Sequence, residues 1–271
     1  MAPLAIVAIA FTSLVLLVLL FCACCVIETA VRMYIGAGQV RYDPSFFPAP
    51  SVPTTSVSTL KLLTLNTYQI PVRRHGLVSM IRLCQRVDAD VIVLQEMWSL
   101  QGCAVAAHLL RDSYVHVLSP NNYQSMIGSG LFVASKSPLV PIRFESFRDV
   151  GAAPDFVSRK GYLLFDTMGW RVVATHLAWY PHSIVKQQLV QLSKVANVDV
   201  VAGDLNTCDT ELVETMLRGR VICNGETYPE SGVQLDYIVV TNKNIAVTVC
   251  EVISAVGISD HNGIYSVMTK I

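Results

Sequence analysis

Charged side chains are scarce in this 271-residue chain, and their signs cancel. Lys and Arg number 20, Asp and Glu number 20, and together they make up only 15% of the residues. Hydrophobic residues make up 52%. A disordered chain combines low hydrophobicity with high net charge, so this composition excludes one. A net charge of zero also excludes a strongly basic domain that holds nucleic acid by non-specific attraction.

The chain also lacks a disulfide or metal-binding pattern of cysteines. Outside the N-terminal region its spacings match no such framework, and no Asn-x-Ser/Thr acceptor for glycosylation occurs. Both absences agree with a reducing compartment. The cysteines concerned are Cys84, Cys103, Cys208, Cys223 and Cys250.

No charged residue precedes Glu28, and residues 4–27 are almost entirely Leu, Val, Ile, Ala, Phe and Cys. As a helix this run would extend roughly 36 Å, enough to cross a hydrocarbon core of about 30 Å. A cleaved signal peptide has a basic start and a shorter apolar core, and this segment has neither. We therefore predict a single-pass N-terminal transmembrane helix within residues 1–31. Arg32 and Arg41 favour a cytoplasmic domain only weakly, so the side of the membrane stays open.

Residues 32–58 are rich in Pro, Ser and Thr, which favours an extended linker. We predict a linker over 32–58 and a globular catalytic domain over 59–271. Cys22, Cys24 and Cys25 lie where the apolar run ends. They are either palmitoylation sites beside the membrane or small apolar residues of the helix.

From residue 60 onward, short apolar runs alternate with helical patterns. The predicted strands are 60–66, 90–95, 114–118, 130–134, 139–146, 161–166, 171–175, 199–202, 235–241, 246–253 and 263–268. The predicted helices are 76–86, 100–111, 183–196 and 210–218. Helices toward both ends of this order, with strands between them, predict two packed sheets with helices outside.

Polar residues recur where the apolar strands begin or end. They are Asn66, Glu96, His176, Asp204 with Asn206, Asp236, and Asp260 with His261. Any one of them alone would more readily be a cap, a turn residue or a structural histidine. Strand ends are where the active sites of α/β proteins form, so the repeated coincidence indicates one site.

The residue types in this set point to phosphate chemistry. Four carboxylates with Asn offer hard oxygen ligands, which suit Mg²⁺. His176 and His261 add acid–base capacity near neutral pH. A divalent metal, a base and cationic groups together suit attack on a phosphate ester. The other four histidines, at positions 75, 108, 116 and 182, carry no such signal.

In this order, the residues resemble the endonuclease/exonuclease/phosphatase superfamily, whose fold is DNase I-like. Gly203-Asp204-Leu205-Asn206 and Ser259-Asp260-His261 are the most specific motifs. The resemblance covers about residues 60–268. It implies an α/β fold, a four-layer α/β/β/α sandwich.

Within that superfamily the chain is most similar to the neutral, Mg²⁺-dependent sphingomyelinases. Gln95-Glu96-Met97-Trp98, the strand that begins at Ser129, and Lys160-Gly161 carry this similarity. The inositol polyphosphate phosphatases usually have an aromatic–Cys–Asp–Arg segment where this chain has Leu235-Asp236-Tyr237. The resemblance implies hydrolysis of sphingomyelin to ceramide and phosphocholine.

The resemblance also implies which residues bind metal and substrate. Glu96 would bind Mg²⁺, for which Mn²⁺ can substitute, with Asn66 and Asp260 at or near the metal. Asn206 would hold a phosphate oxygen. Lys160 would contact the phosphate or the substrate hydroxyl, although a solvated strand end would also explain this residue.

Four further residues would perform the chemistry. Asp204 would orient the attacking water, and His261 would act as general base. Asp236 would fix the tautomer of His261 and favour its cation. His176 would stabilise charge on the phosphoryl oxygens.

The expected partner is a phospholipid substrate in a membrane, with no stable nucleic-acid partner. Another phosphodiesterase, phosphatase or nuclease of the superfamily is the first alternative. Arg73, Arg74, Arg82 and Arg86 would then form a basic face, although such a helix is usually just solvated. A non-catalytic, membrane-tethered binding protein is the second alternative, and the completeness of the residue set argues against it.

Overall fold

The computed structural model describes residue 21 and residues 57–69, 76–120, 128–152, 155, 158 and 160–271. The predicted membrane anchor and most of the predicted linker lie outside this part of the chain. Within it, no helix is both long and apolar enough to cross a membrane. The anchor and the linker therefore stay predictions.

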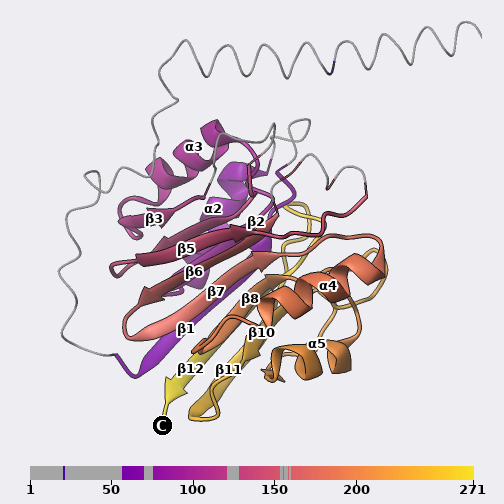
Figure 1. The fold of residues 1–271 in the computed structure, drawn as a ribbon. Helices are drawn as coiled ribbons and strands as arrows, with labels where there is room; N and C mark the ends of the chain where they lie inside the picture. Colours follow the sequence, from indigo (N-terminus) through magenta and orange to yellow (C-terminus); the bar gives the residue numbers. More distant parts are fainter. Residues whose placement is uncertain are drawn as a thin grey trace, which may run out of the picture. The chain divides into compact units, whose positions relative to one another are not determined.

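Two six-stranded sheets form the domain (Figure 1). The first sheet has the order β11-β12-β1-β2-β4-β3. Its strands are β1 (Thr59–Asn66), β2 (Val91–Gln95), β3 (His116–Leu118), β4 (Phe132–Ser135), β11 (Ile245–Ile253) and β12 (Gly263–Lys270). The second has the order β5-β6-β7-β8-β10-β9. Its strands are β5 (Val140–Ser146), β6 (Gly161–Thr167), β7 (Trp170–His176), β8 (Val200–Asp204), β9 (Arg220–Val221) and β10 (Asp236–Val240).

Four helices cover the outer faces of the sheets. They are α2 (Leu77–Val87), α3 (Leu100–Leu110), α4 (His182–Leu192) and α5 (Thr210–Leu217). Figure 1 shows α2 and α3 on one side of the paired sheets and α4 and α5 on the other. Caps help to set where helices begin, because the Ser99 and Asp209 side chains accept hydrogen bonds from the first turns of α3 and α5.

Three apolar clusters hold these layers together. Alternate residues of β1, such as Leu62 and Leu63, face opposite sides of the first sheet. Leu62 belongs to a core between the two sheets, whereas Leu63 packs with α2 and α3. In the second sheet Val172 faces the inter-sheet core, and Val173 packs with α4 and α5. The predicted two-sheet DNase I-like fold is confirmed, with its helices outside.

The predicted elements all occur, with shifted boundaries. The predicted helix 183–196 is too long, because α4 ends at Leu192. After Leu192 the backbone forms isolated turns instead of continuing the helix. Asn197 then adopts a left-handed conformation with φ of 57°. The sequence pattern missed β9, since two residues are too few to show a period. That strand exists through its pairing with β10.

The topology brings specific strand ends to one edge. In each sheet one parallel pair is central, and its carboxyl ends align Asn66 with Gln95 and His176 with Asp204. Strands β10 and β12 run antiparallel to these pairs. Their first residues, rather than their last, therefore reach the same edge, which places Asp236 opposite Asp204.

Gly203 is required by the close approach of β7 and β8. Its φ is +151°, and an added Cβ would lie 1.9 Å from the carbonyl oxygen of Thr175. Gly203→Ala should therefore destabilise the fold by about 3 kcal/mol or more, since backbone must move. Gly102→Ala is the control, because its Cβ would meet only Ser99 at 3.6 Å within α3. We expect this control to leave stability unchanged or slightly raised. Thermal unfolding of the two full-length variants checks this, and equal melting temperatures would contradict it.

Candidate active site

Asn66 joins the two sheets at the site. Its side-chain amide donates to Asp204 Oδ2 of the second sheet at 2.9 Å and to Glu96 Oε1 at 3.2 Å. The Asn66 side chain sits at the end of β1, and the Asn66 carbonyl oxygen accepts a hydrogen bond from Ser259 Oγ at 2.7 Å. One buried residue thus ties together the segments that carry the predicted metal ligands.

His261 and Asp236 form a buried pair. The distance from His261 Nδ1 to Asp236 Oδ2 is 2.7 Å, and both side chains are almost fully buried. The Ser259 hydroxyl accepts from the backbone N–H of His261, which fixes the turn before β12. The ring of Tyr228 lies 4.9 Å from the His261 ring, so the imidazole is held from two sides.

Asp204 lies between the two histidines and the amide of Asn66. Its Oδ2 is 3.5 Å from His176 Nε2, and its Oδ1 accepts from the backbone N–H of Asn206 at 2.9 Å. The ring of Trp98 packs against His176, with centroids 5.9 Å apart. His176 is 1% exposed, and its Nδ1 has no hydrogen-bond partner among the described residues.

Lys160 is buried rather than solvated. Its ammonium pairs with Asp155 Oδ1 at 2.8 Å and donates to the carbonyl oxygen of Leu177 at 3.0 Å. The side-chain amide of Asn206 donates to that same carbonyl at 2.9 Å. The simpler interpretation of Lys160, a solvated strand end, is therefore wrong. Its ammonium is held beside the chain that follows His176.

The environment gives the two histidines opposite charge states. Burial lowers the pKa of His176 well below its usual value, and the positive charges of Lys160 and His261 lower it further. For His261 burial also acts to lower the pKa, but the charge and hydrogen bond of Asp236 outweigh it and raise the pKa to about 10. At neutral pH the free site thus holds one neutral and one cationic imidazole.

The carboxylates are crowded together and poorly solvated. Burial, and then the charge of Asp236, raises the pKa of Asp204 to about 7. Burial also raises the pKa values of Glu96 and Asp260, and the charge of Asp260 adds to the effect on Glu96. Such a cluster favours a cation, because positive charge offsets both the desolvation and the mutual repulsion.

The donor set fits a divalent cation such as Mg²⁺. Carboxylate and amide oxygens are the ligands that this ion takes. Asp236 Oδ1 is buried without a hydrogen-bond partner among the described residues. Side-chain atoms of Asp204, Asp236 and His261 also lie within 4.8 Å of one another. This group differs from the predicted ligands Glu96, Asn66 and Asp260, and Asn66 connects the two groups through its bond to Asp204. The ligand assignment stays a prediction.

The structure gathers the predicted residues at one edge, and it adds others to which the sequence assigned no role. The added residues are Asp155, Ser259, Trp98 and Tyr228, which hold Lys160, the β12 turn, His176 and His261, respectively. Trp98 and Ser259 belong to motifs that mark the family resemblance. Asp155 and Tyr228 stand in loops, where no periodicity marks them.

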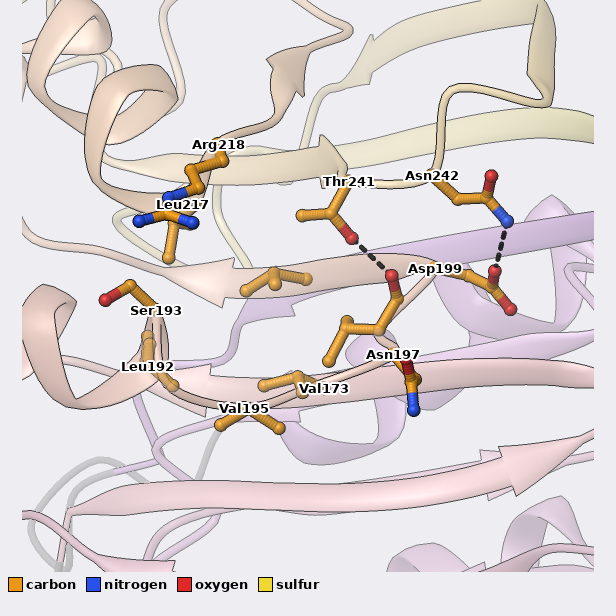
Figure 2. Close-up of a pocket in the computed structure, with 12 residues that line it drawn as sticks. Val173, Leu192, Ser193, Val195, Asn197, Asp199, Leu217, Arg218, Thr241 and Asn242 are labelled. Atoms are coloured by element: carbon orange, nitrogen blue, oxygen red, sulfur yellow. Dashed lines mark hydrogen bonds between the residues drawn. The ribbon is translucent and has the colours of Figure 1, made fainter.

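A cavity of about 450 Å³ lies elsewhere, near the start of β8. Figure 2 shows its apolar floor, which includes Val173 and Leu217, and its rim, which carries Arg218. At the rim Asn242 donates to Asp199 Oδ1 at 2.7 Å. None of the predicted site residues lines it. The predicted site residues lie at the opposite end of β8.

Comparison with known proteins agrees with the fold. The sequence model of the Endonuclease/Exonuclease/phosphatase family matches residues 63–261, and the chain belongs to this family. Hydrolysis of phosphate esters is the chemistry of that family. No curated protein matches the chain by sequence alone.

Solved structures with the same fold include bacterial enzymes. Sphingomyelinase C from Streptomyces griseocarneus has a TM-score of 0.60 at 18% identity, with 79% of this chain and 100% of that chain covered. A beta toxin mutant from Staphylococcus aureus with bound magnesium ions has a TM-score of 0.61 at 16% identity, covering 76% and 98%. A humanized TDP2 from D. rerio has a TM-score of 0.55 at 16% identity, covering 79% and 100%. At these identities the likeness shows the fold alone.

Removing the charge of Asp236 should lower the pKa of His261. In Asp236→Asn the ring loses the carboxylate that keeps it cationic, while burial still disfavours the cation. Histidine NMR titration of the metal-free full-length protein would then show His261 becoming neutral at a lower pH than in the unmodified protein. The control is His116 on β3, whose pKa burial lowers in both proteins alike. An unchanged His261 titration would contradict the assigned pair.

Removing only one member of the Asp155–Lys160 ion pair should lower the stability of the protein. Asp155→Ala leaves a buried ammonium without its partner, which should cost about 3–5 kcal/mol of unfolding free energy. Asp155→Ala combined with Lys160→Met removes both charges and should recover part of that loss. Denaturant unfolding of the full-length proteins measures the difference. A double variant no more stable than Asp155→Ala would refute the coupling.

Proposed function

We propose that the protein is a membrane-anchored, Mg²⁺-dependent phosphodiesterase that hydrolyses sphingomyelin to ceramide and phosphocholine. The observation that carries the proposal is the convergence of the His261–Asp236 pair, Asp204 and His176 at one sheet edge. Family membership supports hydrolysis of a phosphate ester. The substrate class is supported by the resemblance to sphingomyelinases and by the uncharged N-terminal run of residues.

The pair of His261 and Asp236 is suited to receive a proton from water once the ring is neutral. In the free site the ring is cationic, and a divalent cation bound among the carboxylates would lower its pKa because like charges repel. Asp236 binds Nδ1, which leaves Nε2 as the atom that exchanges a proton with water. The carboxylate also stabilises the imidazolium that forms. Asp204 accepts hydrogen bonds from two neighbours and can align the attacking water for displacement at phosphorus.

The remaining groups stabilise negative charge on the phosphoryl oxygens. His176, Asn206 and the ammonium of Lys160 bring donors to one side of the site. When bound, Mg²⁺ supplies positive charge at Glu96, Asn66 and Asp260, which polarises the phosphate and offsets the repulsion among the carboxylates.

The basic residues considered for nucleic acid do not favour a nuclease. Arg73 and Arg74 lie outside the described residues. Arg82 and Arg86 are exposed on α2. Arg86 lies at the end of α2 that leads into the start of β2, and the catalytic groups lie at the other end of β2.

The test is Mg²⁺-dependent release of phosphocholine from sphingomyelin vesicles by the full-length protein. His261→Ala and Asp204→Ala should each lower turnover by about 10²-fold or more, because each removes a group acting at the reacting atoms. EDTA should abolish turnover, and Mg²⁺ should restore it. His108→Ala is the matched control, since that exposed histidine on α3 should leave turnover unchanged.

Phosphatidylcholine, a phosphoinositide and abasic DNA should be assayed in parallel. Faster turnover of one of these would assign the site to another branch of the family. Full activity of His261→Ala would refute the catalytic scheme. Absence of Mg²⁺-dependent turnover on every phosphodiester would favour the non-catalytic alternative.

A further inference from the structure

An aromatic pair stands exposed beside the site. Trp179 and Tyr180 are each 54% exposed, and their ring centroids are 5.6 Å apart. Val150, which is 53% exposed, lies in a neighbouring segment. That segment is bonded to the pair, because the Ala152 N–H donates to the carbonyl oxygen of Tyr180 at 2.9 Å. We call Val150, Trp179 and Tyr180 the aromatic patch.

The backbone beneath the patch is fixed to the catalytic groups. The Trp179 N–H donates to Asp155 Oδ2 at 2.8 Å, and the other oxygen of Asp155 holds Lys160. The preceding Ala178 N–H donates to the buried side chain of Gln188 on α4 at 2.7 Å. The pair begins three residues after His176, so its rings lie at the same edge of the sheets as the site.

Gly151, which follows Val150, lies close to the segment of the aromatic pair. An added Cβ on Gly151 would lie 2.8 Å from Asp155 Oδ2 and 2.9 Å from both the Ala178 side chain and the Tyr180 carbonyl. The segment that carries Val150 is therefore packed closely against the segment that carries the aromatic pair.

We propose that the aromatic patch inserts into the headgroup region of the bilayer that holds the substrate and presses the site against it. The proposal rests on the proposed function, in which the substrate is a membrane lipid. Trp and Tyr have an apolar ring with a polar edge and concentrate at the membrane–water boundary.

The chain itself favours a bilayer over a protein partner. The predicted anchor lies within residues 1–31, and residues 32–56 separate it from the first described residue of the domain. As the extended linker that their composition predicts, these residues would span at most roughly 80 Å, at about 3.1 Å per residue. The domain would thus stay within reach of the membrane surface, where a patch of three side chains would suffice to orient it.

Fluorescence quenching tests insertion without requiring turnover. The full-length protein is reconstituted in vesicles of phosphatidylcholine and sphingomyelin, in EDTA, with and without brominated phosphatidylcholine. The chain has three tryptophans, of which Trp170 is fully buried and Trp98 is half-buried. The difference in quenching between the unmodified protein and Trp179→Phe therefore reports the contribution of Trp179. We expect strong quenching in the unmodified protein and little in the variant.

The control moves the exposed tryptophan to the other edge of the molecule. Val115 is 65% exposed and precedes β3, whose first residue His116 pairs with Ser135 opposite the start of β2. Trp179→Phe with Val115→Trp should show no added quenching. Equal quenching of a tryptophan at 115 and at 179 would overturn the proposal, as would no quenching at 179.

Activity provides a second measurement. Trp179→Ala with Tyr180→Ala should lower hydrolysis of vesicle sphingomyelin at least about fivefold, because less apolar surface enters the bilayer. Hydrolysis of the soluble diester bis(p-nitrophenyl) phosphate should stay unchanged, as should the melting temperature. Equal losses on both substrates would overturn the proposal, because the patch would then act within the site.

The failure of the proposed function would look different. Quenching at Trp179 without turnover of any lipid would refute the enzyme assignment and still support insertion. Turnover of sphingomyelin without quenching at Trp179, and with full activity of the double variant, would refute insertion and still support the enzyme assignment.

Discussion

The site depends on one hydrogen-bonding group between the sheets, the side-chain amide of Asn66. It donates to Asp204, which is 138 residues away in the sequence, and to Glu96 in its own sheet. Both contacts are short, and Asn66 is only 1% exposed. If either sheet slipped by one residue, side chains would swap faces and this contact would be lost. The apolar core between the sheets therefore sets the catalytic distances as well as the stability.

Around this link, burial and charge assign different chemistry to similar side chains. Burial, and then the positive charges of Lys160 and His261, lower the pKa of His176, so this ring stays neutral. His261 lies against a buried carboxylate and stays cationic in the free site. The carboxylates are buried and held close together, and both burial and mutual repulsion raise the pKa values of Asp204 and Asp260. A bound cation would offset both costs, so metal binding and stability of the site would be linked.

The chain after His176 joins the catalytic edge to the molecular surface. Leu177 supplies one carbonyl to both Lys160 and Asn206, and Asp155 holds Lys160 together with the backbone of Trp179. Such a fold is shared by enzymes with different substrates, so it does not choose among them. Exposed loop residues such as Trp179 and Tyr180 lie outside the three apolar cores, and binding residues are disproportionately found on such loops.

By itself, the sequence determined the elements and the chemical types at the site. Alternation of apolar residues is a local signal, so it located the strands and placed Asn66, Glu96, His176 and Asp204 at their ends. It could not locate Asp155, whose place opposite Lys160 comes from loop geometry, nor β9, which exists only through pairing. Only the tertiary structure decided which imidazole is charged and that Asn66 reaches Asp204. The reason is physical: periodicity reports which side of its own sheet a residue faces, whereas charge state and contact across 138 residues depend on how two sheets pack.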